Sequence, residues 1–242
     1  MIAITGATGK LGGAVVKALL EKAPGTHLVA SAREPEKAQA LAALGVEVRH
    51  GDFSLPETLG AAFRGATQVL LISSNAAAYG GNPLEQHHAA IEAAKKAGVK
   101  RVLYTSHMAA SASSLFPPML THAKTEAMLA ASGMRWTALR NGFYASSALD
   151  FIGDGLKAGR ITLPADGKVV WTSHADLAVG SAAVLAQEGS FDGPLPLTAS
   201  VALDMSDIAR TASQVLGREV QREVLSDEAF EEQLKSQGVP SA

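Results

Sequence analysis

The chain of 242 residues contains no cysteine. This absence excludes disulfides, cysteine-ligated zinc and a thiol nucleophile. Charged residues make up only 18% of the chain, with a formal net charge of −2 and no basic run, so nothing favours binding to nucleic acid or to a membrane surface. No apolar run approaches the roughly 20 residues that span a bilayer, and Gly6 interrupts the apolar start that a signal peptide would need. We therefore expect a soluble, cytoplasmic protein.

Apolar residues, by contrast, make up 47% of the chain, which is enough for a sizeable core. In the first part of the sequence, short apolar runs alternate with alanine- and leucine-rich stretches of helical spacing. The runs at 2–5, 27–32, 46–50, 68–73, 99–105 and 135–139 predict buried strands, and the stretches at 11–22, 36–44, 55–63, 84–97 and 119–131 predict helices. This alternation predicts an α/β fold with a Rossmann-type doubly wound parallel sheet.

After Tyr144 the alternation of strands and helices breaks down. Helices are expected at 146–158, 174–187, 204–216 and 226–236, with short strands and turns between them. We expect residues 1–145 to form an NAD(P)-binding Rossmann domain and residues 146–242 to form a small C-terminal α/β lobe that covers the substrate. The two parts are expected to make one structural unit.

A glycine-rich segment with the sequence TGATGKLG lies between the first strand and the first helix. Gly6 allows a sharp turn, Gly9 lets the backbone approach a pyrophosphate, and Gly12 lets the helix lie close to the strand. The N-terminus of the helix attracts the negative charge of the pyrophosphate. The segment therefore predicts dinucleotide binding by Gly6, Ala7, Thr8, Gly9, Lys10 and Leu11.

The end of the second strand distinguishes the two nicotinamide cofactors. An NAD site usually places an acidic residue there to bind the ribose 2′-hydroxyl, whereas this chain has Ser31, Ala32 and Arg33. A guanidinium group suits a 2′-phosphate, so the sequence predicts NADPH as the cofactor. The alternative is that Arg33 is an ordinary solvated arginine, and the neighbouring Glu34 counts against a phosphate site.

Polar residues at the ends of the third and fourth strands are further candidates for cofactor binding. Asp52 could accept a hydrogen bond from the adenine amino group and Phe53 could lie against the adenine ring, although Asp52 would also suit the N-terminus of a helix. Ser73 and Ser74 are expected near the nicotinamide ribose, where the alternative is that they form a turn.

Several motifs together resemble the NmrA-like atypical short-chain dehydrogenase/reductases. They are the TGATGxLG segment, Leu70-Leu71-Ile72-Ser73-Ser74, Tyr104-Thr105-Ser106 and Leu139-Arg140-Asn141-Gly142-Phe143-Tyr144. Within that group the chain is most similar to the type 2 NAD(P)H:quinone oxidoreductases and the triphenylmethane reductases. The resemblance implies that a quinone binds against the nicotinamide. It also implies that the cofactor is lined by residues 6–11, Arg33, Ser73, Ser74 and residues 141–146, among them Asn141, Gly142 and Phe143. Thr105 is a further candidate for cofactor binding.

Two departures from the family pattern bear on the reaction. Most short-chain dehydrogenases carry Tyr-x-x-x-Lys on the helix after strand five, and alignment on Glu126 puts Pro118 at the tyrosine position and His122 at the lysine position. Proline donates no proton, so the usual alcohol/ketone mechanism is excluded. A quinone or a cationic dye is a stronger electrophile and needs less acid assistance. The chain also ends at Ala242, earlier than we expect for this family, so a C-terminal helix is expected to be missing.

Candidate catalytic groups are His122, His107 and Tyr144. His122 could hold the nicotinamide ribose or donate a proton to a quinol oxygen; the alternative is a histidine on a helix face. Tyr144 could bind the substrate or belong to the core. Asn141 is expected to fix a turn and contact the cofactor amide. Phe116, Phe143 and Tyr144 are expected to contact the substrate. His87 and His88 show no metal-ligand pattern, and no metal is expected.

The sequence thus predicts an NADPH-dependent reductase that transfers hydride to a quinone or a similar conjugated electrophile without flavin or metal. The rival hypothesis is a non-catalytic redox sensor of the NmrA type, which binds NADP(H) and acts through a protein partner. An isomerase or epimerase with a retained NAD is disfavoured by the missing tyrosine. Homodimer formation is left open.

Overall fold

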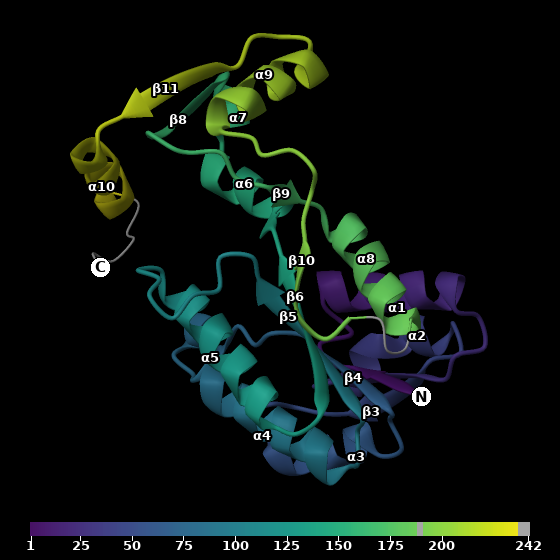
Figure 1. Cartoon of the computed structure of the whole chain (residues 1–242). Helices are drawn as coiled ribbons and strands as arrows, with labels where there is room; N and C mark the ends of the chain where they lie inside the picture. The colour runs from purple at the N-terminus through teal and green to yellow at the C-terminus, as the bar shows by residue number, and fades with distance from the viewer. Residues whose placement is uncertain (188–190, 237–242) are drawn as a thin grey trace. The chain divides into compact units, whose positions relative to one another are not determined.

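The computed structural model describes residues 1–187 and 191–236 of the chain. These residues form two compact units (Figure 1). The first unit combines Met1–Gly142 with His174–Thr198, and the second combines Phe143–Ser173 with the segment that begins at Ala199. The chain passes between the two units three times, after Gly142, Ser173 and Thr198, whereas a single boundary after residue 145 was expected.

A seven-stranded sheet forms the centre of the first unit, in the order β10-β6-β5-β4-β1-β2-β3. All of its strand pairs are parallel, which confirms the doubly wound Rossmann-type prediction. The strands are β1 (Ile2–Ile4), β2 (Leu28–Ala32), β3 (Glu47–His50), β4 (Gln68–Leu71), β5 (Arg101–His107), β6 (Arg135–Asn141) and β10 (Gly193–Leu197). The chain order reverses between β1 and β4, and ligands of such folds bind at that switch point.

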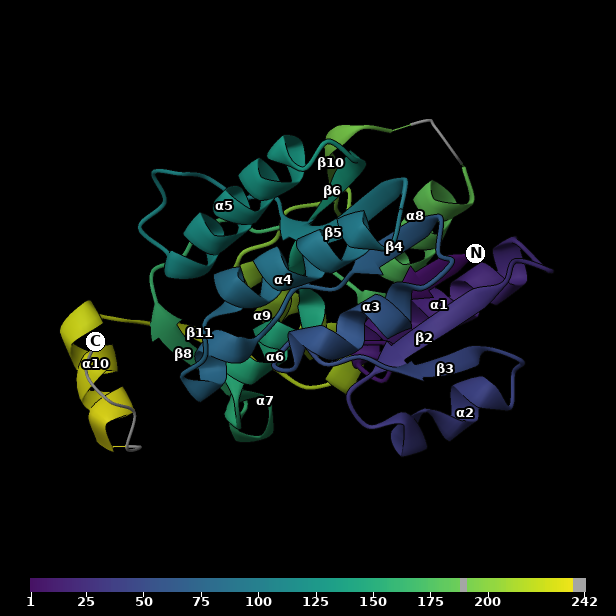
Figure 2. The same cartoon turned by 90° about the horizontal axis from the view of Figure 1, so that it is seen from below.

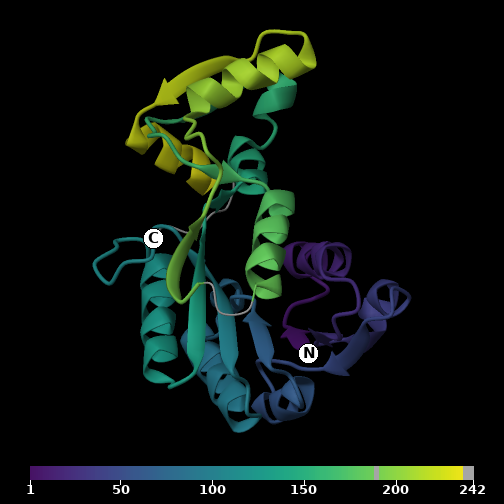
Figure 3. The same ribbon diagram turned by 45° about the vertical axis from the view of Figure 1, so that its right-hand side comes forward.

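Helices cover both faces of this sheet (Figure 2, Figure 3). Helices α3, α4 and α5 lie along one face, and α1 and α8 pack together on the other. Their bounds are α1 (Lys10–Lys22), α2 (Gln39–Ala42), α3 (Leu59–Phe63), α4 (Pro83–Lys96), α5 (Pro117–Ala131) and α8 (His174–Ala186), with 3-10 helices at Pro35–Ala38, Pro56–Thr58 and Ala76–Tyr79. Strands β1, β2 and β4 are buried at every residue, as expected for parallel strands covered on both faces.

Strand β10 explains why residues 174–198 belong to the first unit. It pairs with β6 from Gly193 opposite Thr137 to Leu197 opposite Asn141, and α8 returns the chain to the sheet by packing on α1. Neither Pro194 nor Pro196 of this strand has a backbone N–H. An edge strand needs hydrogen bonds on one side only, so it tolerates both prolines.

The second unit is smaller and has its own core of Ile152, Ile161, Met205, Ala209 and Val220. The helix predicted over 146–158 is interrupted at Gly153, which has a φ of +54°. The elements are β7 (Phe143–Tyr144), α6 (Ala145–Ile152), α7 (Gly155–Ala158), β8 (Arg160–Pro164), β9 (Trp171–Thr172), α9 (Met205–Leu216), β11 (Gln221–Leu225) and α10 (Asp227–Ser236). Residues 237–242, on which the expectation of a missing C-terminal helix rests, lie outside the described residues.

Nowhere in residues 1–187 and 191–236 does the structure contain a helix long and apolar enough to cross a membrane.

Candidate active site

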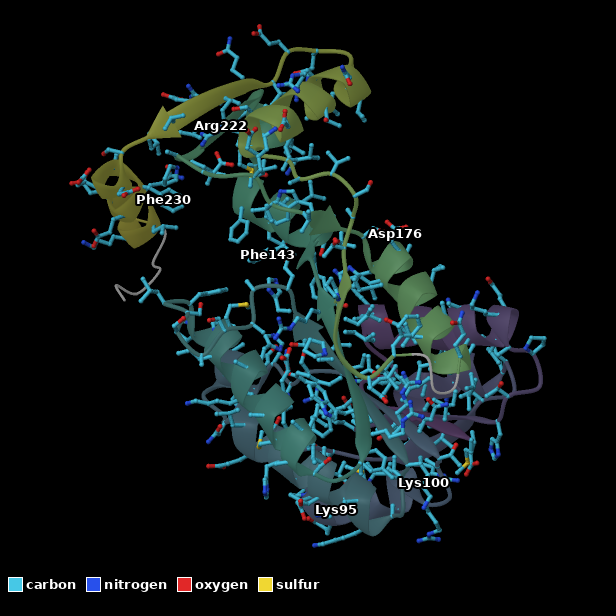
Figure 4. The ribbon with its side chains drawn as sticks, in the orientation of Figure 1. Lys95, Lys100, Phe143, Asp176, Arg222 and Phe230 are labelled. Carbon is cyan, nitrogen blue, oxygen red and sulfur yellow. The ribbon has the colours of Figure 1, made fainter. Side chains whose placement is uncertain are left out.

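The candidate site residues of the first unit lie at the carboxyl edge of its parallel sheet. Strands β1, β4, β5 and β6 all end at this edge, because all of them run in the same direction. In Figure 4, Asp176 in the first turn of α8 marks this end of the first unit, and Lys95 and Lys100 mark the opposite end. The loops after β1, β4, β5 and β6 therefore come together where a dinucleotide would bind.

The glycine loop has the geometry of an anion site. Gly6 has a φ of +57°, a left-handed conformation that favours glycine. A Cβ on Gly12 would lie only 2.3 Å from the carbonyl oxygen of Gly6 and 2.9 Å from its carbon. Gly9 is the N-cap of α1, and no described side chain caps this helix. The first backbone N–H groups of α1 have no acceptor within the helix, so they are available to a phosphate.

The surroundings of Arg33 fit a second phosphate site. Arg33 is exposed just after β2. The carboxylate of Glu34 accepts a hydrogen bond from the Lys37 ammonium at 2.7 Å, so the acid that counted against a phosphate site is paired with a lysine. No side chain in the described ranges pairs with the Arg33 guanidinium. It is therefore available to an anionic ligand.

Asp52 and Phe53, the predicted adenine contacts, also have structural roles. The Asp52 carboxylate accepts a hydrogen bond from the Ser54 backbone N–H at 2.8 Å, and Phe53 packs partly against the core. Asp52 thus stabilises a turn and does not begin a helix. The adenine contact stays a prediction.

Ser73 and Ser74, which follow β4, are held by neighbouring side chains. The Ser73 backbone N–H donates to the Thr105 hydroxyl at 2.8 Å, and that of Ser74 donates to Nε2 of His87 at 2.8 Å. These contacts hold the segment after β4 in place, while contact of both serines with the nicotinamide ribose stays a prediction. Thr105 is buried and positions this loop.

Asn141 is the clearest sign of a missing partner at the carboxyl edge. Its side chain is 1% exposed, yet neither Oδ1 nor Nδ2 has a hydrogen-bond partner within the described part of the chain. A buried amide without partners is costly. One donor and one acceptor side by side match a ligand carboxamide, which offers the complementary pair. Together, the glycine loop, Arg33 and Asn141 fit a phosphorylated nicotinamide dinucleotide.

His87 is a buried structural residue in α4. Its Nε2 accepts the N–H of Ser74, and its Nδ1 lies 2.9 Å from the Thr125 hydroxyl. Because Nε2 accepts, the ring proton of the neutral imidazole must be on Nδ1. Burial, and then the charge of His122, lowers the pKa of His87 to about 4.

Protonation of His87 should destabilise the protein in mild acid. The imidazole titrates near its ordinary value in the unfolded chain and at about 4 in the fold. The contribution of neutral His87 to the free energy of unfolding is therefore complete above pH 6.5, and it is lost as the pH falls toward 4. From pH 7.5 to 5.0, His87 alone should lower the free energy of unfolding by about 2 kcal/mol. Urea unfolding of wild type, His87→Gln and the exposed control His88→Gln measures this. An equal pH dependence in all three proteins would contradict it.

His122 lies in α5 beside two other aromatic rings. Its Nδ1 is 2.8 Å from the Tyr104 hydroxyl, and its ring stacks on His107 with centroids 6.2 Å apart. Burial, and then the charge of His107, lowers the pKa of His122 to about 4, against an opposing effect of Glu126. His122 is therefore neutral at pH 7, and it can act as a hydrogen-bond donor but not as a cation.

Tyr104 is a site residue that sequence reasoning missed. It lies within β5 and is fully buried, so it resembles a core residue in the sequence. The detectable signal was a phenol immediately before Thr105 and Ser106, at the polar end of an apolar strand. Its contact with His122 makes it part of the candidate site.

The remaining candidates are distributed over both units. His107 ends β5, and its Nδ1 accepts the N–H of Ala109 at 3.1 Å, while burial lowers the pKa of the ring. Phe116, at the N-cap of α5, is 52% exposed. Phe143 and Tyr144 form β7 in the second unit, where the Phe143 and Trp171 ring centroids lie 5.9 Å apart. Their contacts with a substrate stay predictions.

Glu126 holds this region of the first unit together. Its carboxylate accepts hydrogen bonds from the Ser106 hydroxyl at 2.6 Å and from two nitrogens of Arg140 at 3.0 and 2.7 Å. The carboxylate is largely buried, and the three residues tie α5 to β5 and β6. The position of His122 on α5 is thereby fixed relative to the end of β5.

Comparison with known proteins identifies the family. Residues 1–241 match the NmrA-like family. The chain belongs to that family. Quinone oxidoreductase 2 of Escherichia coli (strain K12) is 39% identical over 241 residues, which cover 99% of this chain and 83% of the relative. The resemblance found in the sequence motifs is confirmed.

Two solved structures show the same fold as this NmrA-like chain. The NADPH-dependent quinone oxidoreductase QOR2 of Escherichia coli, complexed with NADPH, matches with a TM-score of 0.90 and 38% identity. The triphenylmethane reductase of Citrobacter sp., complexed with NADP(H), matches with a TM-score of 0.87 and 35% identity. Each match covers 99% of this chain and 84% of the other.

Proposed function

We propose that this NmrA-like protein is an NADPH-dependent reductase that transfers hydride to a quinone or a similarly electrophilic conjugated acceptor, without flavin or metal. The observation that carries the proposal is the unpartnered amide of Asn141 at the same sheet edge as the glycine loop. These features suit a nicotinamide dinucleotide. The names of its relatives support quinones and triarylmethyl dyes as acceptors.

Residues of the first unit would divide the binding of NADPH between them. The N–H groups at the start of α1 would bind the pyrophosphate, Arg33 the 2′-phosphate, and Asn141 the carboxamide. When bound, NADPH supplies the hydride. The glycine loop positions the cofactor, and the protein holds the acceptor beside it. This positioning is the main contribution of the protein to the rate of hydride transfer.

The site has no tyrosine acid at the usual position and has a neutral histidine, and both features would restrict the acceptors that it can reduce. Pro118 lies in the first turn of α5, at the position that aligns with the usual tyrosine, and it has no proton to donate. His122 is neutral at pH 7, because its pKa is about 4, so it can donate a hydrogen bond to an oxygen that gains negative charge. A quinone is reduced with this modest assistance, whereas an unactivated ketone is not. Phe116 of the first unit would supply an apolar contact.

Anaerobic oxidation of NADPH by the purified chain tests this proposal. The assay uses a panel of benzoquinones and naphthoquinones without added flavin, and denatured protein is checked by chromatography for bound flavin. We expect oxidation well above the spontaneous rate and faster turnover with NADPH than with NADH. A protein that binds NADPH but accelerates none of these reactions would be a sensor, and that result would overturn the proposal.

A further inference from the structure

Tyr104 occupies a fixed position between two histidines. Its ring lies edge-on to that of His87, with centroids 5.2 Å apart, and its centroid is 5.7 Å from that of His122. The backbone of Tyr104 is held in the sheet between Leu71 of β4 and Ala138 of β6, and its side chain is fully buried. The phenol therefore has little freedom, and its hydroxyl is directed at Nδ1 of His122, 2.8 Å away.

The direction of this hydrogen bond follows from the acidities of the two groups. His122 is uncharged at pH 7 and carries one ring proton. A phenolic O–H, with a pKa of about 10, is a stronger acid than the N–H of a neutral imidazole. The hydroxyl of Tyr104 therefore donates and Nδ1 of His122 accepts. An imidazole that accepts at Nδ1 must carry its proton at Nε2.

The Nε2 atom of His122 is not enclosed by the protein. His122 is only partly buried. In residues 1–187 and 191–236, Nε2 has no hydrogen-bond partner and is not among the enclosed polar atoms. The ring stacks on His107, which ends β5 at the carboxyl edge of the sheet. An N–H is thus presented at the edge where the hydride acceptor would bind.

We infer that Tyr104 is a positioning residue for the reduction of quinones: its hydroxyl fixes His122 as the Nε2–H tautomer, and this N–H donates a hydrogen bond to the acceptor oxygen. The inference rests on the proposed function. Removal of the phenol would leave His122 free to exchange between its two tautomers. The tautomer with the proton on Nδ1 would present a lone pair to the oxygen and would repel the charge that develops there.

Two acceptors with different chemistry can show whether Tyr104 and His122 assist the acceptor oxygen or affect hydride transfer in general. A quinone becomes a quinol by taking up two electrons and two protons. Hydride brings both electrons and one proton, and the second proton comes from solvent after negative charge has formed on the oxygen. A triarylmethyl cation becomes its neutral leuco form by taking up hydride alone, and no oxyanion forms. The Nε2–H of His122 therefore assists the first reaction and not the second.

The decisive experiment compares Tyr104→Phe with wild type on both acceptors. We expect the kcat for a benzoquinone to fall about tenfold, which is less than the loss of an entire oxyanion donor. The kcat for a triarylmethyl cation should stay within twofold. Tyr79→Phe is the matched control, since Tyr79 is 82% exposed, and it should change neither rate. Equal losses on both acceptors, or no loss on either, would overturn the inference.

A second readout requires no turnover. The ¹⁵N shifts of the histidine rings report the tautomer, and we expect His122 to be Nε2–H in the wild type and a mixture in Tyr104→Phe. An Nδ1–H tautomer in the wild type would refute the inference even if the enzyme were active. If the wild type reduced neither acceptor, the proposed function would fail, while the ring shifts would still decide whether Tyr104 fixes the tautomer.

Discussion

Replacement of Gly12 by alanine should weaken NADPH binding at least about 100-fold. The new Cβ would lie 2.3 Å from the carbonyl oxygen of Gly6 and 2.9 Å from its carbon. Both are backbone atoms of the loop that has to hold the pyrophosphate, so no flexible side chain can relieve the clash. The start of α1 must move away from the loop, and the N–H groups that bind the phosphate move with it. Titration of NADPH fluorescence measures the change.

Gly13→Ala is the matched control for this variant. A Cβ there would meet the carbonyl oxygen of Ala7 at 3.1 Å, a contact that a shift of a few tenths of an ångström relieves. Gly13→Ala should bind NADPH within about fivefold of wild type, because less than 1 kcal/mol is lost. Thermal melting of both variants checks that they are folded. A folded Gly12→Ala protein with wild-type affinity would show that the loop does not bind the cofactor.

Replacement of Arg33 by alanine should remove the preference for NADPH. A guanidinium that pairs with a phosphate contributes about 1.5–3 kcal/mol, so the dissociation constant for NADPH should rise roughly 10- to 100-fold. The constant for NADH should hardly change, because NADH has no 2′-phosphate. Calorimetric titration with both cofactors gives the ratio of the two constants.

Arg160→Ala serves as the control, since it removes an exposed arginine from the second unit. Its ratio of NADPH to NADH affinity should equal that of the wild type. The affinity of Arg33→Ala for NADPH should also depend less on salt concentration, because a charge pair has been lost. An unchanged ratio in Arg33→Ala would place the 2′-phosphate elsewhere.

Most of the sheet could be predicted from the sequence because buried parallel strands are continuous apolar runs. Strand β10 was not predictable in this way, since Pro194 and Pro196 argue against a strand unless its place at the sheet edge is known. Without β10, the return of residues 174–198 to the first unit could not be foreseen. The break of the predicted helix at Gly153 was likewise hidden, because glycine is only a weak signal inside an apolar helical pattern.

Some residues of the candidate site could be predicted from the sequence, but contacts between distant residues could not. The glycine loop and Arg33 follow from spacing along the chain, because they contact a ligand through local backbone or a strand end. The Tyr104–His122 contact joins a strand to a helix 18 residues later, and periodicity alone makes Tyr104 a core residue. Asn141 was expected near the cofactor amide, but the lack of a protein partner for its side chain is visible only in three dimensions.

Direct hydride transfer from NADPH is the central claim, and isotope transfer tests it most directly. The purified protein would reduce a triarylmethyl cation anaerobically with NADPH that carries deuterium at both C4 positions, in ordinary water. Mass spectrometry of the leuco product then shows the isotope on its central carbon. We expect one deuterium in essentially every product molecule, because the hydride passes to the acceptor without exchange. A product with hydrogen at that carbon would show an exchangeable intermediate carrier and would contradict the proposed mechanism.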